Sequence, residues 1–252
     1  MYCNFNAIVV NNLSFSGVRG AMTTVVKDLI KRGTFILLEG MDRSGKTSQV
    51  QKLVEFLRGT GHNVAQFRFP DRTTITGQQC DKYLTMAKDG NFADEVAHLL
   101  FSANRWEAAE KIQNLIESGT TIVCDRYSYS GIAYSASKGK STLTLDWCAA
   151  PEIGLPAPDV VLYCQVSAEV AAARSGFGQE RYEQEETQRR VHQQFQILQQ
   201  RNNVLRAKGV FAPEWICVDC DKDFDTVHEC IKEHALAVMK DTNGPMNRFV
   251  EF

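Results

Sequence analysis

The sequence predicts an α/β domain in which a five-stranded parallel sheet is flanked by helices on both faces. Short apolar runs typical of buried strands alternate with longer stretches that have helical spacing. Strands that alternate with helices form parallel sheets joined by crossovers. A glycine-rich octapeptide directly follows the first apolar run. With 252 residues, of which 44% are hydrophobic and 23% charged, the chain can bury a sizeable core in one domain.

The first predicted strand leads into a phosphate-binding loop. The apolar run FILL at 35–38 is followed by GMDRSGKT at 40–47, which matches G-x-x-x-x-G-K-[ST]. The two glycines allow a tight backbone path whose amide N–H groups, with the start of the next helix, form a nest for phosphate oxygens. Lys46 would contact the β- and γ-phosphates, and the Thr47 hydroxyl would hold Mg²⁺. A strand before and an amphipathic helix after are the context that this motif requires.

The remaining elements follow in order along the chain. Four further runs read as strands, at residues 63–69, 120–124, 159–164 and 215–218. Helical spacing predicts helices at residues 45–60, 74–89, 94–118 and 183–206, and at the end of the chain. Two helical pieces are expected after the third strand, interrupted by Gly and Pro around residues 151–158.

Three of these segments should meet in one crevice. In parallel sheets, ligands bind outside the carboxyl ends of the strands. The phosphate loop, residues 69–72 and residues 125–127 all occupy such ends. Two of them carry an arginine, Arg72 and Arg126, whose planar guanidinium matches phosphate oxygens. Either arginine alone is more often a surface salt-bridge partner, but together they indicate a second substrate that bears a phosphate, and hence an enzyme.

Composition narrows the classes of partner. The net charge of −2 argues against a general nucleic-acid or membrane binder, and no apolar run approaches the length of a bilayer span. Eight cysteines are scattered along the chain, several inside apolar runs. We expect reduced thiols in a reducing compartment, the cytoplasm or the nucleus.

Residues 1–33 do not read as part of the core, which we expect to span residues 34–252. They have no acidic residue before Asp28 but carry several basic, Ser and Asn residues, features shared with organellar transit peptides. The alternatives are a disordered extension or a translation start at Met22. The extension therefore leaves a mitochondrial location open.

Four longer motifs make the sequence similar to a known family. They are FPDRT at 69–73, LLFSANRWE at 99–107, DRYSYSG at 125–131 and GLPAPD at 154–159. In this order and spacing, the chain resembles thymidylate kinases of the eukaryotic type. The resemblance implies a P-loop NTPase fold of the nucleoside-monophosphate kinase kind, with a short lid, that is usually a homodimer. It also implies Mg²⁺-dependent transfer of the γ-phosphoryl group of ATP to dTMP, giving dTDP for dTTP biosynthesis and DNA synthesis.

The resemblance assigns the donor side of the site to the phosphate loop and to a lid at about residues 174–182. Its catalytic residues would be Lys46, Arg43, Asp42 and Asp125. Its ATP-binding residues would be Gly40, Asp42, Arg43, Ser44, Gly45, Lys46, Thr47, Ser48, Arg174 and Arg181. Arg43 would clamp the transferring phosphate, and Asp125 would join Thr47 near Mg²⁺ through water. Because the acceptor phosphate is already ionised near neutral pH, no general base is required, and catalysis reduces to positioning and charge neutralisation.

The resemblance also assigns the acceptor side. Its dTMP-binding residues would be Asp42, Phe69, Arg72, Phe101, Arg105, Arg126, Ser130, Gly131, Tyr134 and Tyr182. Phe101 would stack on thymine, and Arg105 would donate to a thymine carbonyl. Asp42 would accept from the ribose 3′-hydroxyl, and Tyr182 would lie where a 2′-hydroxyl would crowd it.

The sequence alone also allows other interpretations. Without the motif, Phe101 and Trp106 in an apolar helix would more often be core residues than base contacts. Cys217 and Cys220 form a lone C-x-x-C without a second pair, which disfavours zinc. The chain could also be a kinase of another nucleoside monophosphate, such as UMP or AMP, or a catalytically silent nucleotide-binding module. Measuring ADP release over a panel of nucleoside monophosphates separates these functions.

Overall fold

A five-stranded parallel sheet forms the centre of the described fold. The structure is a computed structural model and describes residues 31–85, 92–174 and 185–252. The strands are β1 (Phe35–Glu39), β2 (Val64–Arg68), β3 (Thr121–Asp125), β4 (Val160–Gln165) and β5 (Glu214–Asp219). They lie in the order β2-β3-β1-β4-β5, and all neighbouring strands are parallel. The predicted fold class is confirmed.

Helices connect the strands at nearly the predicted positions. They are α2 (Lys46–Gly59), α3 (Ile75–Thr85), α4 (Asp94–Glu117), α5 (Ser128–Ala136), α6 (Leu145–Ala149), the 3₁₀ turn η1 (Ala150–Glu152), α7 (Ala168–Ala173), α8 (Glu185–Ala207) and α9 (Phe224–Asp241). The prediction for residues 74–89 corresponds to α3, and its last residues lie outside the described part of the chain. A helix is expected between the fourth and fifth strands without bounds for α7, which is only six residues long.

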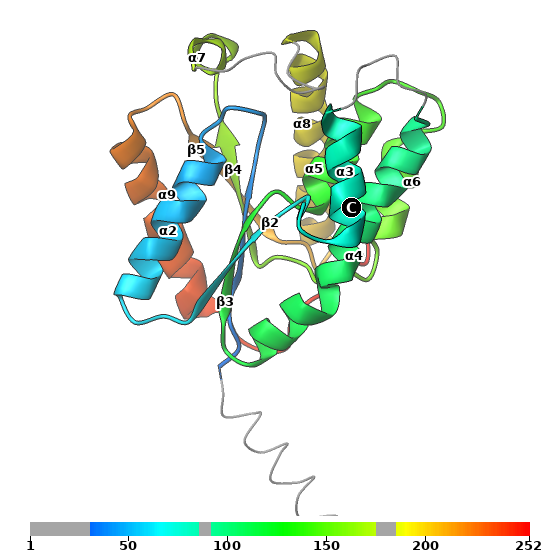
Figure 1. Ribbon diagram of the computed structural model, residues 1–252. Helices are drawn as coiled ribbons and strands as arrows, with labels where there is room; N and C mark the ends of the chain where they lie inside the picture. Colours follow the sequence, from blue (N-terminus) through cyan, green and yellow to red (C-terminus); the bar gives the residue numbers. More distant parts are fainter. Residues whose placement is uncertain (1–30, 86–91, 175–184) are drawn as a thin grey trace, which may run out of the picture. The chain divides into compact units, whose positions relative to one another are not determined.

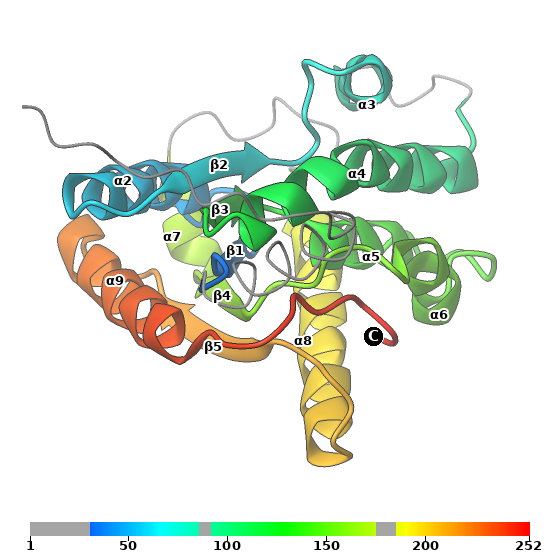
Figure 2. The ribbon, with the colours of Figure 1, turned by 90° about the horizontal axis from the view of Figure 1, so that it is seen from below.

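The two faces of the sheet bury two separate apolar cores. Along β1, Phe35 and Leu37 belong to one core, whereas Ile36 and Leu38 belong to the other. All four side chains are completely buried. Successive side chains of a strand point to opposite faces, so a strand covered on both faces needs a continuous apolar run. Figures 1 and 2 show α2 and α9 on one face of the sheet, and α4, α5 and α8 on the other.

The strand order brings the predicted segments to one edge of the sheet. From β1 the chain crosses to β2, returns to β3, and then continues to β4 on the other side of β1. Open α/β sheets bind ligands where the strand order reverses in this way, outside the carboxyl ends of the strands. Leu38 of β1 and Arg68 of β2 both lie opposite Asp125 of β3. The segments that follow these three strands therefore start side by side.

The chain divides into two units, residues 1–31 and Arg32–Phe252, and nearly all described residues belong to the second. In this unit, the Arg32 guanidinium donates two hydrogen bonds, at 2.9 and 2.7 Å, to the Asp159 carboxylate just before β4. The same carboxylate accepts from the backbone N–H of Phe35, at 2.8 Å. Arg32 thus takes part in the start of the sheet, two residues before the boundary expected from the sequence.

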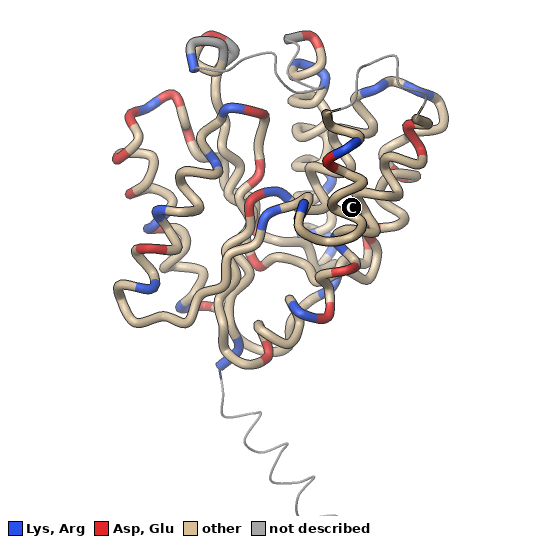
Figure 3. Tube along the Cα trace, viewed as in Figure 1, with Lys and Arg blue, Asp and Glu red and all other residues tan. Residues whose placement is uncertain are grey.

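The described surface carries both signs of charge. Acidic and basic residues are interspersed along the helices and their connections (Figure 3), in keeping with the net charge of −2. Among the described helices, none combines the length and the apolar composition needed to cross a membrane.

Candidate active site

The phosphate loop is shaped by two glycines between β1 and α2. Gly40 has a φ of 143°, and a Cβ there would lie 2.5 Å from the carbonyl oxygen of Cys164. Gly45 has a φ of 88° and is the N-cap of α2, without a side chain to cap the helix. Among the described residues, no N-cap side chain binds the first N–H groups of α2, and the positive end of the helix dipole favours an anion there. This geometry is compatible with the predicted nest for phosphate oxygens.

Lys46 lies inside this loop. Its side chain is only 4% exposed, and its ammonium group donates to the carbonyl oxygen of Met41 and, at 3.0 Å, to the hydroxyl of Ser44. Burial, together with the nearby positive charge of Arg126, lowers the pKa of Lys46 to about 8. At neutral pH, Lys46 is therefore charged in most molecules. Ser48, in the first turn of α2, is exposed.

Thr47 and Asp125 meet where β1 and β3 end. The Thr47 hydroxyl donates to one carboxylate oxygen of Asp125, at 2.6 Å. The other oxygen, Oδ1, is buried and has no hydrogen-bond partner among the described residues. Mg²⁺ prefers oxygen ligands and usually takes one or two from the protein, with water and phosphate oxygens completing its shell. The residues present therefore fit a magnesium site.

A pocket adjoins the loop and contains all the predicted dTMP-binding residues that the structure describes. Nine of them line it, namely Asp42, Phe69, Arg72, Phe101, Arg105, Arg126, Ser130, Gly131 and Tyr134. The tenth, Tyr182, lies outside the described residues, as does Arg181. The lining also includes Arg68, Pro70, Leu84, Tyr127 and Ser135, which were not predicted. Residues from β2, α3, α4 and α5 and the loop after β1 thus enclose one space.

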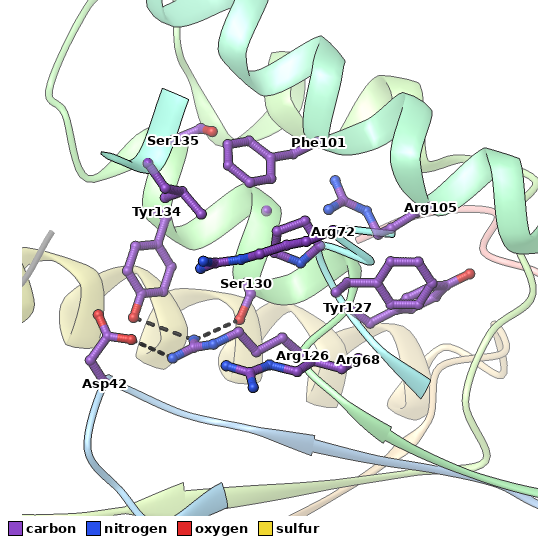
Figure 4. A pocket seen from close by; sticks show the side chains of 14 residues that line it. Asp42, Arg68, Arg72, Phe101, Arg105, Arg126, Tyr127, Ser130, Tyr134 and Ser135 are labelled. Carbon is purple, nitrogen blue, oxygen red and sulfur yellow. Dashed lines mark hydrogen bonds and ion pairs between the residues drawn. The ribbon is translucent and has the colours of Figure 1, made fainter. Parts of the chain in front are cut away.

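Arg126 occupies the end of the pocket nearest the phosphate loop. Its guanidinium forms an ion pair with the Asp42 carboxylate and donates to the carbonyl oxygen of Gly40, at 3.1 Å. It also donates to the hydroxyls of Ser130 and Tyr134, at 3.3 and 3.4 Å. Figure 4 shows Asp42, Arg126 and Tyr134 converging at this end of the pocket. Although burial alone would raise it, the pKa of Asp42 is lowered by the charges of Arg126 and Lys46, so Asp42 is ionised at neutral pH.

The opposite end of the pocket is formed by α4. Phe101 and Arg105 both point from this helix into the pocket (Figure 4). The Phe101 ring packs edge-on against Tyr83, with the ring centroids 5.9 Å apart. Arg105 is 3% exposed and forms an ion pair with Glu152 of η1. Arg72, at the side, forms an exposed ion pair with Asp81 at 2.7 Å.

The predicted lid residue Arg174 contacts the loop arginine. The Arg43 guanidinium donates to the carbonyl oxygen of Arg174 at 2.9 Å, and the Arg174 guanidinium donates to the carbonyl oxygen of Arg43 at 2.6 Å. A second nitrogen of Arg174 donates to the carbonyl oxygen of Cys220 at 2.8 Å. Arg174 therefore joins the phosphate loop to the segment after β5.

Three polar residues that sequence reasoning missed hold this site together. Glu39, completely buried, accepts from the N–H groups of Tyr127 and Ser130, at 2.9 and 3.0 Å, and so caps the start of α5. Burial raises the pKa of Glu39, against the opposing effect of these bonds. Gln188 of α8 donates to the Asp42 carboxylate at 2.7 Å, and Glu152 pairs with Arg105. In the sequence, Glu39 could have been found because it is an acidic residue at the end of an apolar strand. No comparable local pattern marks Gln188 or Glu152.

Comparison with known proteins agrees with the resemblance seen in the sequence. The thymidylate kinase family model matches residues 38–240. A thymidylate kinase from Arabidopsis thaliana is 51% identical over 167 residues, which cover 66% of this chain and 62% of that protein. Thymidylate kinases from Danio rerio and Homo sapiens are each 41% identical, covering 81% and 80% of this chain and 90% and 89% of their own length.

A solved structure of thymidylate kinase from Candida albicans is also similar. It superposes with a TM-score of 0.74 at 34% identity, and the match covers 87% of this chain and 99% of that one. The structural similarity therefore extends over most of the chain. This chain belongs to the thymidylate kinase family, the enzymes that phosphorylate dTMP to dTDP.

Proposed function

We propose that this chain transfers the γ-phosphoryl group of ATP to dTMP between the phosphate loop and the adjoining pocket, giving ADP and dTDP. One observation carries the proposal. Asp42 belongs to the loop and also lines the pocket, and Arg126 of the pocket donates to the backbone of the loop at Gly40. A phosphate held in the loop and a phosphate held by Arg126 would therefore be neighbours, which is the arrangement that direct transfer needs.

On the donor side, the uncapped start of α2 and the Lys46 ammonium group would bind the β- and γ-phosphates of ATP. Thr47 and Asp125 would hold Mg²⁺, which when bound neutralises charge on the phosphates. Arg43 lies in the loop itself, and its guanidinium could contact the phosphoryl group during transfer. Its charge would then stabilise the transition state more than the bound substrate.

On the acceptor side, Arg126 and Arg72 would hold the dTMP phosphate, since guanidinium groups match phosphate oxygens in charge and shape. The Asp42 carboxylate would accept from the ribose 3′-hydroxyl. At the far end, Phe101 would stack on thymine and Arg105 would donate to its carbonyl. We also propose Tyr182 for the sugar, from the resemblance alone, because it lies outside the described residues.

Transfer itself would need no proton to be removed. The dTMP phosphate carries its second negative charge near neutral pH, so its oxygen is already a nucleophile. The residues of this chain would align the two phosphates and neutralise the charge that builds up between them. No covalent intermediate with the protein is involved.

A coupled assay of ADP release tests the function. We expect Mg²⁺-dependent ADP release with dTMP that far exceeds release with UMP, AMP or dCMP, and loss of release when EDTA removes the metal. Lys46→Ala should lower kcat by a hundredfold or more while the circular dichroism spectrum stays native, because such preorganised charges typically contribute that much. A preference for UMP or AMP would establish a different nucleotide kinase. No release with any acceptor would establish a silent nucleotide-binding module.

We further propose that the chain forms a homodimer through the outer face of α4. Three large apolar side chains, Val96, Leu99 and Trp106, are 53%, 47% and 43% exposed on this helix. Their spacing of three and seven residues places them on one side of the helix. Such an apolar stripe on a helix surface is typical of a site that binds another protein surface, and a second copy of this chain is the occupant that the resemblance implies.

A further inference from the structure

The buried ion pair between Arg105 and Glu152 joins the pocket to a segment outside it. The Nε and Nη2 nitrogens of Arg105 donate to the two carboxylate oxygens of Glu152, at 2.7 and 2.6 Å. The two side chains are 3% and 0% exposed. Arg105 lines the pocket, whereas Glu152 lies behind it in η1. A two-point contact of this kind fixes both the position and the plane of a guanidinium.

Two neighbours, Glu152 and Gly131, restrict the orientation of this guanidinium. The ion pair occupies Nε and Nη2, so Nη1 is the nitrogen outside the carboxylate contact. The backbone of α5 lies close to the same guanidinium. A Cβ at Gly131 would lie 2.4 Å from Nη2 and 3.0 Å from Nη1. Only a glycine allows so close an approach. The arginine is therefore clamped between the Glu152 carboxylate and the backbone of α5.

Glu152 is itself held in place by α4. The carbonyl oxygen of its neighbour Pro151 accepts from the Trp106 indole, at 2.7 Å, and from the Ser102 hydroxyl, at 3.2 Å. These two residues lie on either side of Arg105 along the same helix. The η1 segment is thus fastened to α4 at the level of the arginine. The carboxylate has little freedom to follow the guanidinium if the guanidinium moves.

We propose that Glu152 is the positioning residue for base selection, because it holds the Arg105 guanidinium so that its Nη1–H donors face the carbonyl at position 4 of the pyrimidine. This inference rests on the proposed function, in which dTMP is the acceptor. Nη1 carries donors only, so it favours a 4-carbonyl base and meets the amino group of a cytosine donor to donor. Glu152 touches no substrate and acts through Arg105.

Glu152 needs its negative charge, as well as its shape, to hold the Arg105 guanidinium. Burial disfavours its ionised form, but the adjacent Arg105 guanidinium lowers the pKa of Glu152 below its ordinary value. The residue is therefore a carboxylate at neutral pH and accepts both bonds. In Glu152→Gln, one carboxylate oxygen becomes an amide NH₂, which cannot accept from a guanidinium N–H. The guanidinium would then have to turn, and Nη1 would leave the position it needs for the base.

The experiment compares two acceptors that differ only at ring positions 3 and 4, dTMP and 5-methyl-dCMP. The variants are Glu152→Gln and Glu152→Asp, and the matched control is Asp159→Asn. The control removes the charge from a partly buried two-point pair with an arginine, Arg32 to Asp159, whose side chains are 9% and 12% exposed. It lies outside the pocket lining. We measure kcat, KM for each acceptor and the thermal midpoint of unfolding.

For Glu152→Gln we expect KM for dTMP to rise about tenfold or more, in line with the loss of a hydrogen bond to a charged group. We expect kcat at saturating dTMP to remain near that of the wild type, and the preference for dTMP over 5-methyl-dCMP to narrow by a similar factor. Glu152→Asp should change KM for dTMP and the acceptor preference in the same direction, but by a smaller factor. Asp159→Asn should lower the thermal midpoint and leave the preference unchanged.

An unchanged preference in Glu152→Gln, with both acceptors losing kcat/KM in parallel, would show that the pair only stabilises the fold and would overturn the inference. If Glu152→Gln does not fold, Glu152→Asp decides, and a wild-type preference and KM in that variant would overturn it too. A wild-type chain that does not phosphorylate dTMP would instead refute the proposed function itself.

Discussion

Raising the pH above about 8 should inactivate the free phosphate loop by removing the proton of Lys46. The ammonium group is 4% exposed and lies close to the positive charge of Arg126. Burial and that charge lower its pKa to about 8. About nine-tenths of the molecules then carry the charge at pH 7 and about one-tenth at pH 9. Because kcat/KM for ATP reports the free enzyme, it should fall about tenfold for each pH unit above 8.

Binding of ATP should reverse this loss of charge. The ATP phosphates favour the protonated lysine, so at pH 8.5 the complex should take up about 0.8 proton per ATP. Calorimetric titrations in buffers with different ionisation enthalpies measure that uptake. Stability should move in the opposite direction to activity. Between pH 8 and 10.5 the unfolded chain holds this proton and the folded chain does not, so the contribution of Lys46 to the free energy of unfolding rises with pH.

Ionisation of dTMP does not contribute to the pH dependence of kcat/KM above pH 8, because its phosphate has lost its second proton well below that pH. Lys46→Arg is the control, since a guanidinium keeps its proton throughout this range. Any residual activity of this variant should be level above pH 8. A wild-type kcat/KM for ATP that stays level from pH 7 to 9.5 would refute the reasoning.

Four further predictions follow from the structure. Arg43→Ala should slow single-turnover phosphoryl transfer far more than it weakens dTMP binding, and a fall in binding alone would make Arg43 a ground-state contact. Leu99→Glu should convert a dimer to a monomer in size-exclusion chromatography with light scattering, and an unchanged mass would exclude the α4 face as the interface. Deletion of residues 1–30 should leave activity and the thermal midpoint unchanged. The same deletion combined with Arg32→Ala should lower the free energy of unfolding by about 2–3 kcal/mol, because it leaves the largely buried Asp159 carboxylate without its guanidinium partner. A thermal midpoint equal to that of the deletion alone would refute this prediction.

Much of this site could be predicted because its signals are local in the sequence. Gly40, Gly45 and Lys46 form their part of the site through backbone conformation and helix polarity, both of which a short motif specifies. The apolar runs predicted all five strands within one or two residues of their observed bounds. Parallel pairing then placed the residues after β1, β2 and β3 at one edge of the sheet.

The partners that support the site could not be predicted in this way. Glu152 and Gln188 reach their partners, Arg105 and Asp42, over 47 and 146 residues of chain, and only tertiary packing decides which polar residue arrives there. The six residues of α7 have too few turns to show a helical period. The strand order also required the structure, because alternation of strands and helices specifies parallel pairing but not which strands are neighbours.

The position of Asp42 has a consequence for how the two substrates bind. Its backbone N–H donates to Gln188 at 3.1 Å, and its carboxylate accepts from Gln188 and pairs with Arg126. In the proposed complex, a shift of the loop on ATP binding would change the environment of the acceptor phosphate, and dTMP would act on the loop in return. We therefore expect the affinities of the two nucleotides to depend on each other. Thermodynamic linkage requires that ATP change the dissociation constant of dTMP by the same factor by which dTMP changes that of ATP.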